Sequence, residues 1–106
     1  MRKHSVKFSH RASAQIRSIF AYIAEENVSA ALKMVDRLEE KARQLADMPL
    51  IGTELPEKEY PFLQPGYRRL SAKPFIIYYR VIDRTVFITH IIHARQNQSK
   101  ALAEKE

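Results

Sequence analysis

A change of hydrophobic period near the middle of the chain is the strongest constraint on its fold. The first half repeats apolar residues at helical spacing, whereas the segment from Tyr67 to Ala94 is rich in β-branched and aromatic residues. Helices and sheets each bury one apolar face, so this order predicts a helical layer packed on a sheet. The predicted fold class is therefore α+β.

Two helices are predicted, over about 10–26 and 29–47. Ser9 and Ser29 are the expected N-caps, because a serine hydroxyl accepts a hydrogen bond from an otherwise unpaired backbone N–H. The apolar residues of each segment form one stripe at helical spacing. They are Ala12, Ile16, Ile19, Phe20 and Ile23 in the first helix, and Ala31, Val35, Leu38, Ala42 and Leu45 in the second. With a short connection between them, these stripes predict an antiparallel helical hairpin laid on the sheet.

The strands are predicted from alternation and from residue type. They cover 5–9 before the helices, and 67–71, 75–82 and 86–94 after them. The expected order is β-α-α-β-β-β, with the last three strands as an antiparallel meander and the first strand added at an edge.

The remaining segments are predicted as a turn, a loop and a tail. Met48-Pro49-Leu50-Ile51-Gly52 ends the second helix, and 53–66, rich in proline and glutamate, is a surface loop. Residues 1–95 are expected to form a single domain. Residues 96–106 are expected to be a polar tail, either frayed or forming a short helix.

Composition excludes several classes of protein. The chain has no cysteine, which removes disulfides, thiol catalysis and Cys-ligated zinc. Four scattered histidines offer no metal-ligand spacing, so neither a metal nor another cofactor is expected. No signal peptide and no apolar run long enough for a membrane span is evident. The expected location is therefore the cytoplasm, with no membrane partner.

Positive charge is concentrated on the predicted sheet. The chain carries a net charge of +6, and 68–95 contains six basic residues against the single acid Asp83, a net +5. The basic residues are Arg68, Arg69, Lys73, Arg80, Arg84 and Arg95. Arginine pairs with phosphates through a planar fork, which fits nucleic acid. An acidic protein surface fits equally well.

The last strand carries the strongest candidate for acid–base chemistry. Strict alternation places Thr89, Ile91, His93 and Arg95 on one face, opposite a face that includes His90. His93 has the pKa range for proton transfer, and Arg95 would stabilise a phosphate beside it. The alternative is a structural histidine that hydrogen-bonds the strand ends. No glycine-rich phosphate loop and no Ser-His-Asp spacing is present, which argues against a metabolic enzyme.

In this order and spacing the motifs resemble the RelE/ParE superfamily of bacterial type II toxin–antitoxin toxins, over about residues 6–95. The resemblance rests on the opening strand, the helix residues Tyr22-Ile23 and Ala30-Ala31, and three later motifs. These are Leu45-Ala46-Asp47-Met48-Pro49-Leu50-Ile51-Gly52, Tyr78-Tyr79-Arg80-Val81 and Ile91-Ile92-His93-Ala94-Arg95. The long paired helices and the Leu-Ala-x-x-Pro-x-x-Gly turn favour the ParE branch.

The ParE branch implies a protein that arrests growth by poisoning DNA gyrase and is not an enzyme. Arg69, Arg80 and Arg95 are then the expected target contacts. The branch also implies a cognate antitoxin, whose disordered segment folds across the hairpin and the sheet in a hetero-oligomer.

The RelE branch implies instead a ribosome-dependent endoribonuclease that cleaves mRNA. His93, Arg95, Arg69 and Tyr79 are the candidate catalytic residues in that case. The acid-rich residues 53–60 argue against it, because they would repel ribosomal RNA. A third reading is a non-toxic member that binds its antitoxin and regulates their operon.

Overall fold

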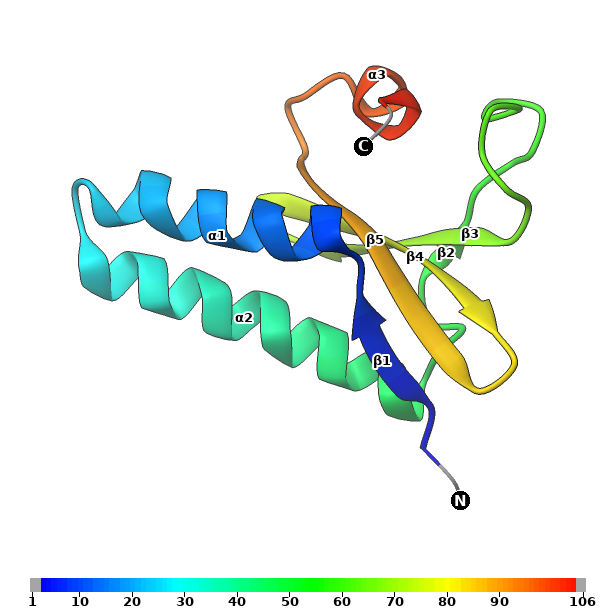
Figure 1. The fold of residues 1–106 in the computed structure, drawn as a ribbon, viewed down its shortest axis with the longest axis horizontal. Coiled ribbons are helices and arrows are strands. Elements are labelled where there is room, and N and C mark those ends of the chain that lie inside the picture. Colours follow the sequence, from blue (N-terminus) through cyan, green and yellow to red (C-terminus); the bar gives the residue numbers. More distant parts are fainter. Residues whose placement is uncertain (1–2, 105–106) are drawn as a thin grey trace.

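The computed structural model describes residues 3–104 and confirms the predicted α+β class. A hairpin of two helices covers one face of a five-stranded sheet (Figure 1). The elements are β1 (Ser5–Phe8), α1 (His10–Ala24), α2 (Val28–Asp47), β2 (Thr53–Glu54), β3 (Tyr67–Ala72), β4 (Phe75–Ile82), β5 (Thr85–His93) and α3 (Gln98–Ala103). The short β2 was not predicted. Of the two alternatives for residues 96–106, α3 shows that the segment forms a short helix rather than a frayed tail.

The sheet has the order β1-β5-β4-β3-β2. Strands β3, β4 and β5 form the predicted antiparallel meander, and β1 joins its edge by parallel pairing with β5. Lys73 and Pro74 connect β3 to β4. Asp83 and Arg84 connect β4 to β5, with Asp83 in the left-handed region at φ 55°, which aspartate adopts more readily than most residues.

Local hydrogen bonds define where the two long helices begin. Ser9 caps α1 as predicted, and its hydroxyl oxygen accepts from the Ala12 N–H at 3.0 Å. The prediction of Ser29 as the second cap is wrong. Asn27 caps α2, and its side-chain oxygen accepts from the Ala30 N–H at 2.9 Å. Asparagine fills this position as well as serine does, so α2 starts one residue earlier than expected.

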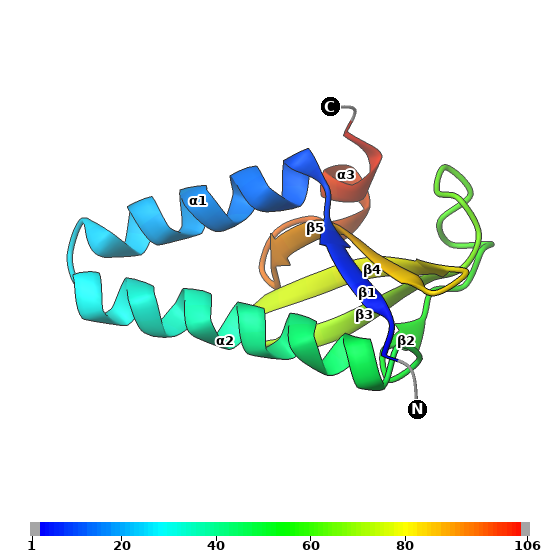
Figure 2. The same ribbon diagram turned by 60° about the horizontal axis from the view of Figure 1, so that its bottom comes forward.

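The two helices bury part of their predicted stripes against one face of the sheet. The side chains that meet there are called the helix-side core. Its buried members are Ala12, Leu38, Ala42, Leu45, Ala72, Phe75, Ile77, Tyr79, Val86, Ile88 and Ile91. In Figures 1 and 2 the far end of the hairpin extends beyond the sheet, which leaves that part of the hairpin without a sheet beneath it.

A β-bulge in β5 overturns the strict alternation predicted for that strand. Tyr79 pairs with Ile88 but Tyr78 pairs with His90, so Thr89 is the extra residue. Ile88 and Ile91 therefore both belong to the helix-side core. His90 therefore lies on the face of the sheet opposite Ile88, whereas strict alternation predicts that the two share a face.

β1 pairs with β5 only as far as Ile88, and side chains at the start of α1 cover the edge of β5 after that residue. Ser9 donates to the carbonyl of Thr89 at 3.1 Å, and the Gln15 side-chain oxygen accepts from the Ile91 N–H at 2.7 Å. These contacts satisfy backbone groups around the bulge that no neighbouring strand pairs. They fix α1 to the strand that leads to the C-terminal segment.

The opposite face of the sheet has a smaller core of its own. This back-face core consists of Leu55, Tyr67, Tyr78, Ile92 and Leu102. Helix α3 and the loop after β2 both pack there, and Figure 1 shows them on the same side of the sheet. The packed part of the chain therefore extends past residue 95 to Leu102, and the loop supplies Leu55 to the core rather than lying wholly on the surface. Among the described helices, none is both long and apolar enough to cross a membrane.

Candidate functional site

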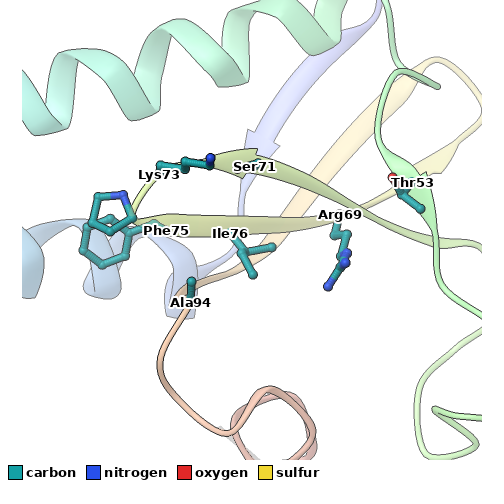
Figure 3. Close-up of a pocket in the computed structure, with 8 residues that line it drawn as sticks. Thr53, Arg69, Ser71, Lys73, Phe75, Ile76 and Ala94 are labelled. Carbon is teal, nitrogen blue, oxygen red and sulfur yellow. The ribbon is translucent and has the colours of Figure 1, made fainter.

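A pocket of ≈ 270 Å³ opens at the edge of the sheet beside Thr53, where the two-residue β2 begins (Figure 3). We call it the sheet-edge pocket. It is lined by Thr53, Arg69, Ser71, Lys73, Pro74, Phe75, Ile76 and Ala94. Two cationic side chains and two hydroxyls thus share one hollow with an apolar wall. The arrangement suits an anion attached to a less polar group.

Arg69 is the one member of the predicted site that lines this pocket. It is exposed and extends from β3 on the same side as Ile76 (Figure 3). Its guanidinium also lies near the hydroxyl of the buried Tyr78. Burial raises the pKa of Tyr78, and the hydrogen-bonding guanidinium of Arg69 opposes that rise. The phenol therefore stays protonated, and it donates to the Gln98 side-chain oxygen at 2.8 Å. Arg69 is in this way linked through Tyr78 to α3.

Tyr79 does not lie in the candidate site. It points into the helix-side core with 0% exposure, and its hydroxyl oxygen accepts from the Gly52 N–H at 2.8 Å. The pKa of this phenol is raised, because the effect of burial exceeds the opposing effect of the Gly52 hydrogen bond. A side chain without solvent access is poorly placed to stack on or orient a substrate, which weighs against the predicted catalytic role of Tyr79. The cross-strand neighbour of Arg69 is Tyr78.

His93 lies at the end of β5 and packs edge-on against Phe75, with ring centroids 5.2 Å apart. Its Nδ1 accepts from the backbone N–H of Arg95 at 3.1 Å. That contact requires an unprotonated Nδ1, so the proton of the neutral ring sits on Nε2. His93 does not line the sheet-edge pocket with Arg69; it lines a second hollow between the helices and the sheet.

Arg80 and Arg95 differ in how freely they can reach a partner. Arg80 is half-buried, with its Nε donating to the Pro65 carbonyl at 3.2 Å and its guanidinium 5.7 Å from the centre of the Tyr67 ring. Arg95 is exposed in the turn after β5, directly after the pocket residue Ala94. Because β5 ends at His93, Arg95 does not share a strand face with it as predicted.

Sequence reasoning missed Thr53, Ser71 and Lys73 as site residues. Thr53 pairs directly with Arg69 through β2, and directly opposed residues point to the same face of a sheet. A strand of two residues carries no period that a sequence pattern can reveal. Lys73 is counted among the basic residues of the predicted sheet but not as a site residue, and the turn after β3 places it at the pocket.

A second hollow, of ≈ 340 Å³, lies under the helical hairpin beside the sheet. We call it the hairpin groove. It is lined by Ser18, Ile19, Tyr22, Ile23, Met34, Pro74, Phe75 and His93, and shares only Pro74 and Phe75 with the sheet-edge pocket. Tyr22 stands 78% exposed at its rim. An aromatic rim over an apolar floor suits an apolar segment of a protein partner.

The residues between 3 and 104 contain no group of three or more histidine, cysteine, aspartate or glutamate side chains that would hold a metal ion.

Comparison with known proteins identifies a family, a curated relative and a solved structure that this chain resembles. The family described as "ParE toxin of type II toxin-antitoxin system, parDE" matches residues 6–98. Toxin ParE3 of Caulobacter vibrioides is 29% identical over 94 residues, covering 88% of this chain and 89% of that protein. A solved structure titled "Chromosomal ParDE TA system from P. aeruginosa" matches with a TM-score of 0.68 and 26% identity. That match covers 86% of this chain and 96% of the other.

Proposed function

The chain belongs to the ParE toxin family of type II toxin–antitoxin systems, and from that membership we propose that it arrests growth by binding and poisoning DNA gyrase. The observation that carries this choice is the separation of three of the four candidate groups for RNA cleavage. Tyr79 is buried, His93 faces the hairpin groove, and Arg69 lines the sheet-edge pocket. General acid–base catalysis needs its groups within hydrogen-bond reach of one substrate. Binding needs only an accessible surface.

The exposed arginines are the contacts by which such a toxin would hold its target. Arg69 and Arg95 are exposed, whereas Arg80 is partly occupied by Pro65 and Tyr67. We therefore assign Arg69 and Arg95 the larger share of target binding, and Arg80 a smaller one.

Induced expression is expected to give filamentous cells and DNA damage while protein synthesis continues. Purified toxin is expected to inhibit supercoiling by gyrase and to trap cleaved plasmid DNA. Arg69→Glu should lower both effects at least tenfold, because charge reversal replaces attraction with repulsion. Cell length, amino-acid incorporation and gel assays of plasmid topology measure these outcomes.

One further variant controls for charge, and another separates this proposal from RNA cleavage. Arg37→Glu makes the same charge change on an exposed position of α2 and should leave the effects on gyrase unchanged. His93→Ala should still arrest growth if the toxin acts by binding. Cleaved mRNA within minutes of induction, abolished by His93→Ala, would instead establish the ribonuclease alternative.

Membership in a type II system implies an antitoxin, and we propose that its disordered segment folds into the hairpin groove and over the adjoining sheet. Tyr22→Ala should raise the antitoxin dissociation constant about tenfold, since exposed aromatic anchors often contribute above about 1.4 kcal/mol. Phe62→Ala is the matched control, because Phe62 is also an exposed aromatic but lies on the loop after β2. Calorimetric titration with the antitoxin segment measures both. Equal losses for the two variants would place the antitoxin elsewhere.

A further inference from the structure

We infer that the sheet-edge pocket binds a phosphate group of a nucleic-acid backbone, so that the toxin contacts DNA directly. The inference rests on the proposed function only for the choice of DNA as the nucleic acid. The pocket itself is argued from its position, its donors and its apolar wall.

The pocket occupies an open edge of the sheet. β2 pairs only with Arg68 and Arg69, so among the described strands none runs beside the rest of β3. The Tyr67 carbonyl accepts from the Leu55 N–H at 2.9 Å, which means that Tyr67 directs its backbone groups toward this edge. Alternation then directs the backbone of Ser71 the same way. The edge therefore offers a backbone N–H in addition to side chains.

Four side chains supply the hydrogen-bond donors. Arg69 and Lys73 carry positive charge, while Thr53 and Ser71 carry hydroxyls. Neither cation forms an ion pair with an acid within residues 3–104. Their charge is thus available to a ligand.

Among the described residues, no carboxylate competes for these donors inside the pocket, since no acid is among its lining residues. Glu54 is the nearest acid along β2. It pairs with Arg68, whereas Thr53 pairs with Arg69, so alternation directs Glu54 to the opposite face of the sheet. An anion entering the pocket therefore meets cations and hydroxyls without facing a like charge.

The shape of the pocket favours a phosphodiester over a carboxylate. A carboxylate accepts hydrogen bonds mainly in one plane, whereas a phosphodiester spreads four oxygens tetrahedrally around phosphorus. The donors around the pocket come from two strands and a turn, and this spread suits the tetrahedral group. Pro74, Phe75, Ile76 and Ala94 form an apolar wall beside them. At ≈ 270 Å³ the hollow is several times the ~30 Å³ share of a water molecule, which leaves room for a phosphate and part of its sugar.

Direct binding of a short fluorescent DNA duplex to the purified toxin, without gyrase, tests the inference. Arg69→Gln and Lys73→Gln should each weaken binding about tenfold. Each should also reduce the slope of log affinity against log salt by roughly 0.9, because each removes one phosphate contact. Arg37→Gln and Lys58→Gln, both at exposed positions, should leave affinity and slope unchanged. Unaltered melting temperatures confirm that the variants are folded.

Two ligand controls separate the sources of the anion. Inorganic phosphate should shift the amide NMR signals of Thr53 and Ser71 weakly, and duplex DNA should shift the same signals at lower concentration. A polyglutamate peptide that displaces the duplex at equal charge would overturn the preference for phosphate. Unchanged affinity and salt slope in both Gln variants would overturn the pocket itself.

Failure of this inference is distinguishable from failure of the proposed function. Pocket-dependent DNA binding without any effect on gyrase would retain the phosphate site and remove the gyrase proposal. If the two Gln variants trap gyrase at the wild-type level and bind DNA as the wild type does, the phosphate site is removed and the gyrase proposal is retained.

Discussion

Gly52→Ala is expected to destabilise the protein by about 3 kcal/mol, although it adds only one methyl group. An added Cβ would lie 2.6 Å from the Tyr79 hydroxyl oxygen and 2.7 Å from the Arg69 carbonyl oxygen. The second contact is with strand backbone, which cannot turn aside as a flexible side chain can. Any shift of Gly52 away from the sheet also lengthens its 2.8 Å hydrogen bond to Tyr79. The cost therefore combines overpacking with loss of a buried hydrogen bond.

Thermal and denaturant unfolding measure this cost. A loss of about 3 kcal/mol should lower the melting temperature by more than roughly 10 °C in a domain of this size. Gly66→Ala is the matched control: an added Cβ there meets nothing within 4 Å, but φ is +89°. That variant should lose only about 1 kcal/mol from backbone strain. Equal losses for the two variants would mean that crowding at Gly52 has been overestimated.

Tyr79→Phe separates the two parts of the Gly52 effect. It leaves the Gly52 N–H buried without its acceptor, at a cost of about 1–3 kcal/mol. It also removes one of the two oxygens that an alanine at position 52 would strike. The combined variant should therefore lose less stability than the sum of the single changes.

Most of the fold was predictable because the helices and the meander are repetitive. Apolar spacing located α1 and α2 to within a few residues, and residue type located β3, β4 and β5. What escaped were features set by single hydrogen bonds. Asn27 rather than Ser29 caps α2, because its side-chain oxygen reaches the Ala30 N–H. Both residues have the chemistry of a cap, and only geometry chooses between them.

The candidate site was predictable in composition but not in arrangement. Concentrated arginine indicated the sheet, and Arg69 indeed lines its pocket. The burial of Tyr79 in the helix-side core was not predictable, because adjacent residues on a strand point to opposite faces and the sequence does not say which face meets the helices. The extra residue Thr89 then moves every later side chain of β5 to the other face.

Leu38→Ala is expected to lower the free energy of unfolding by about 3 kcal/mol, within the range of roughly 2–5 kcal/mol for a leucine truncated in a packed core. Leu38 is 1% exposed and belongs to the helix-side core, where α2 meets the sheet. The substitution removes apolar contacts and leaves a cavity that the sheet on one side and α1 on the other prevent from collapsing fully. The intrinsic helix preference changes little, because leucine and alanine are both strong helix formers.

Leu32→Ala makes the same chemical change on the same helix and isolates the contribution of packing. Leu32 is 53% exposed, so its truncation should change stability by less than about 0.5 kcal/mol. Urea unfolding of both variants measures the difference, and the denaturant slope should stay unchanged if the native state remains compact. A similar small loss in both variants would mean that the hairpin is not packed on the sheet through Leu38. A large difference would confirm that this face of α2, rather than helix propensity, holds the hairpin in place over the sheet that carries Arg69.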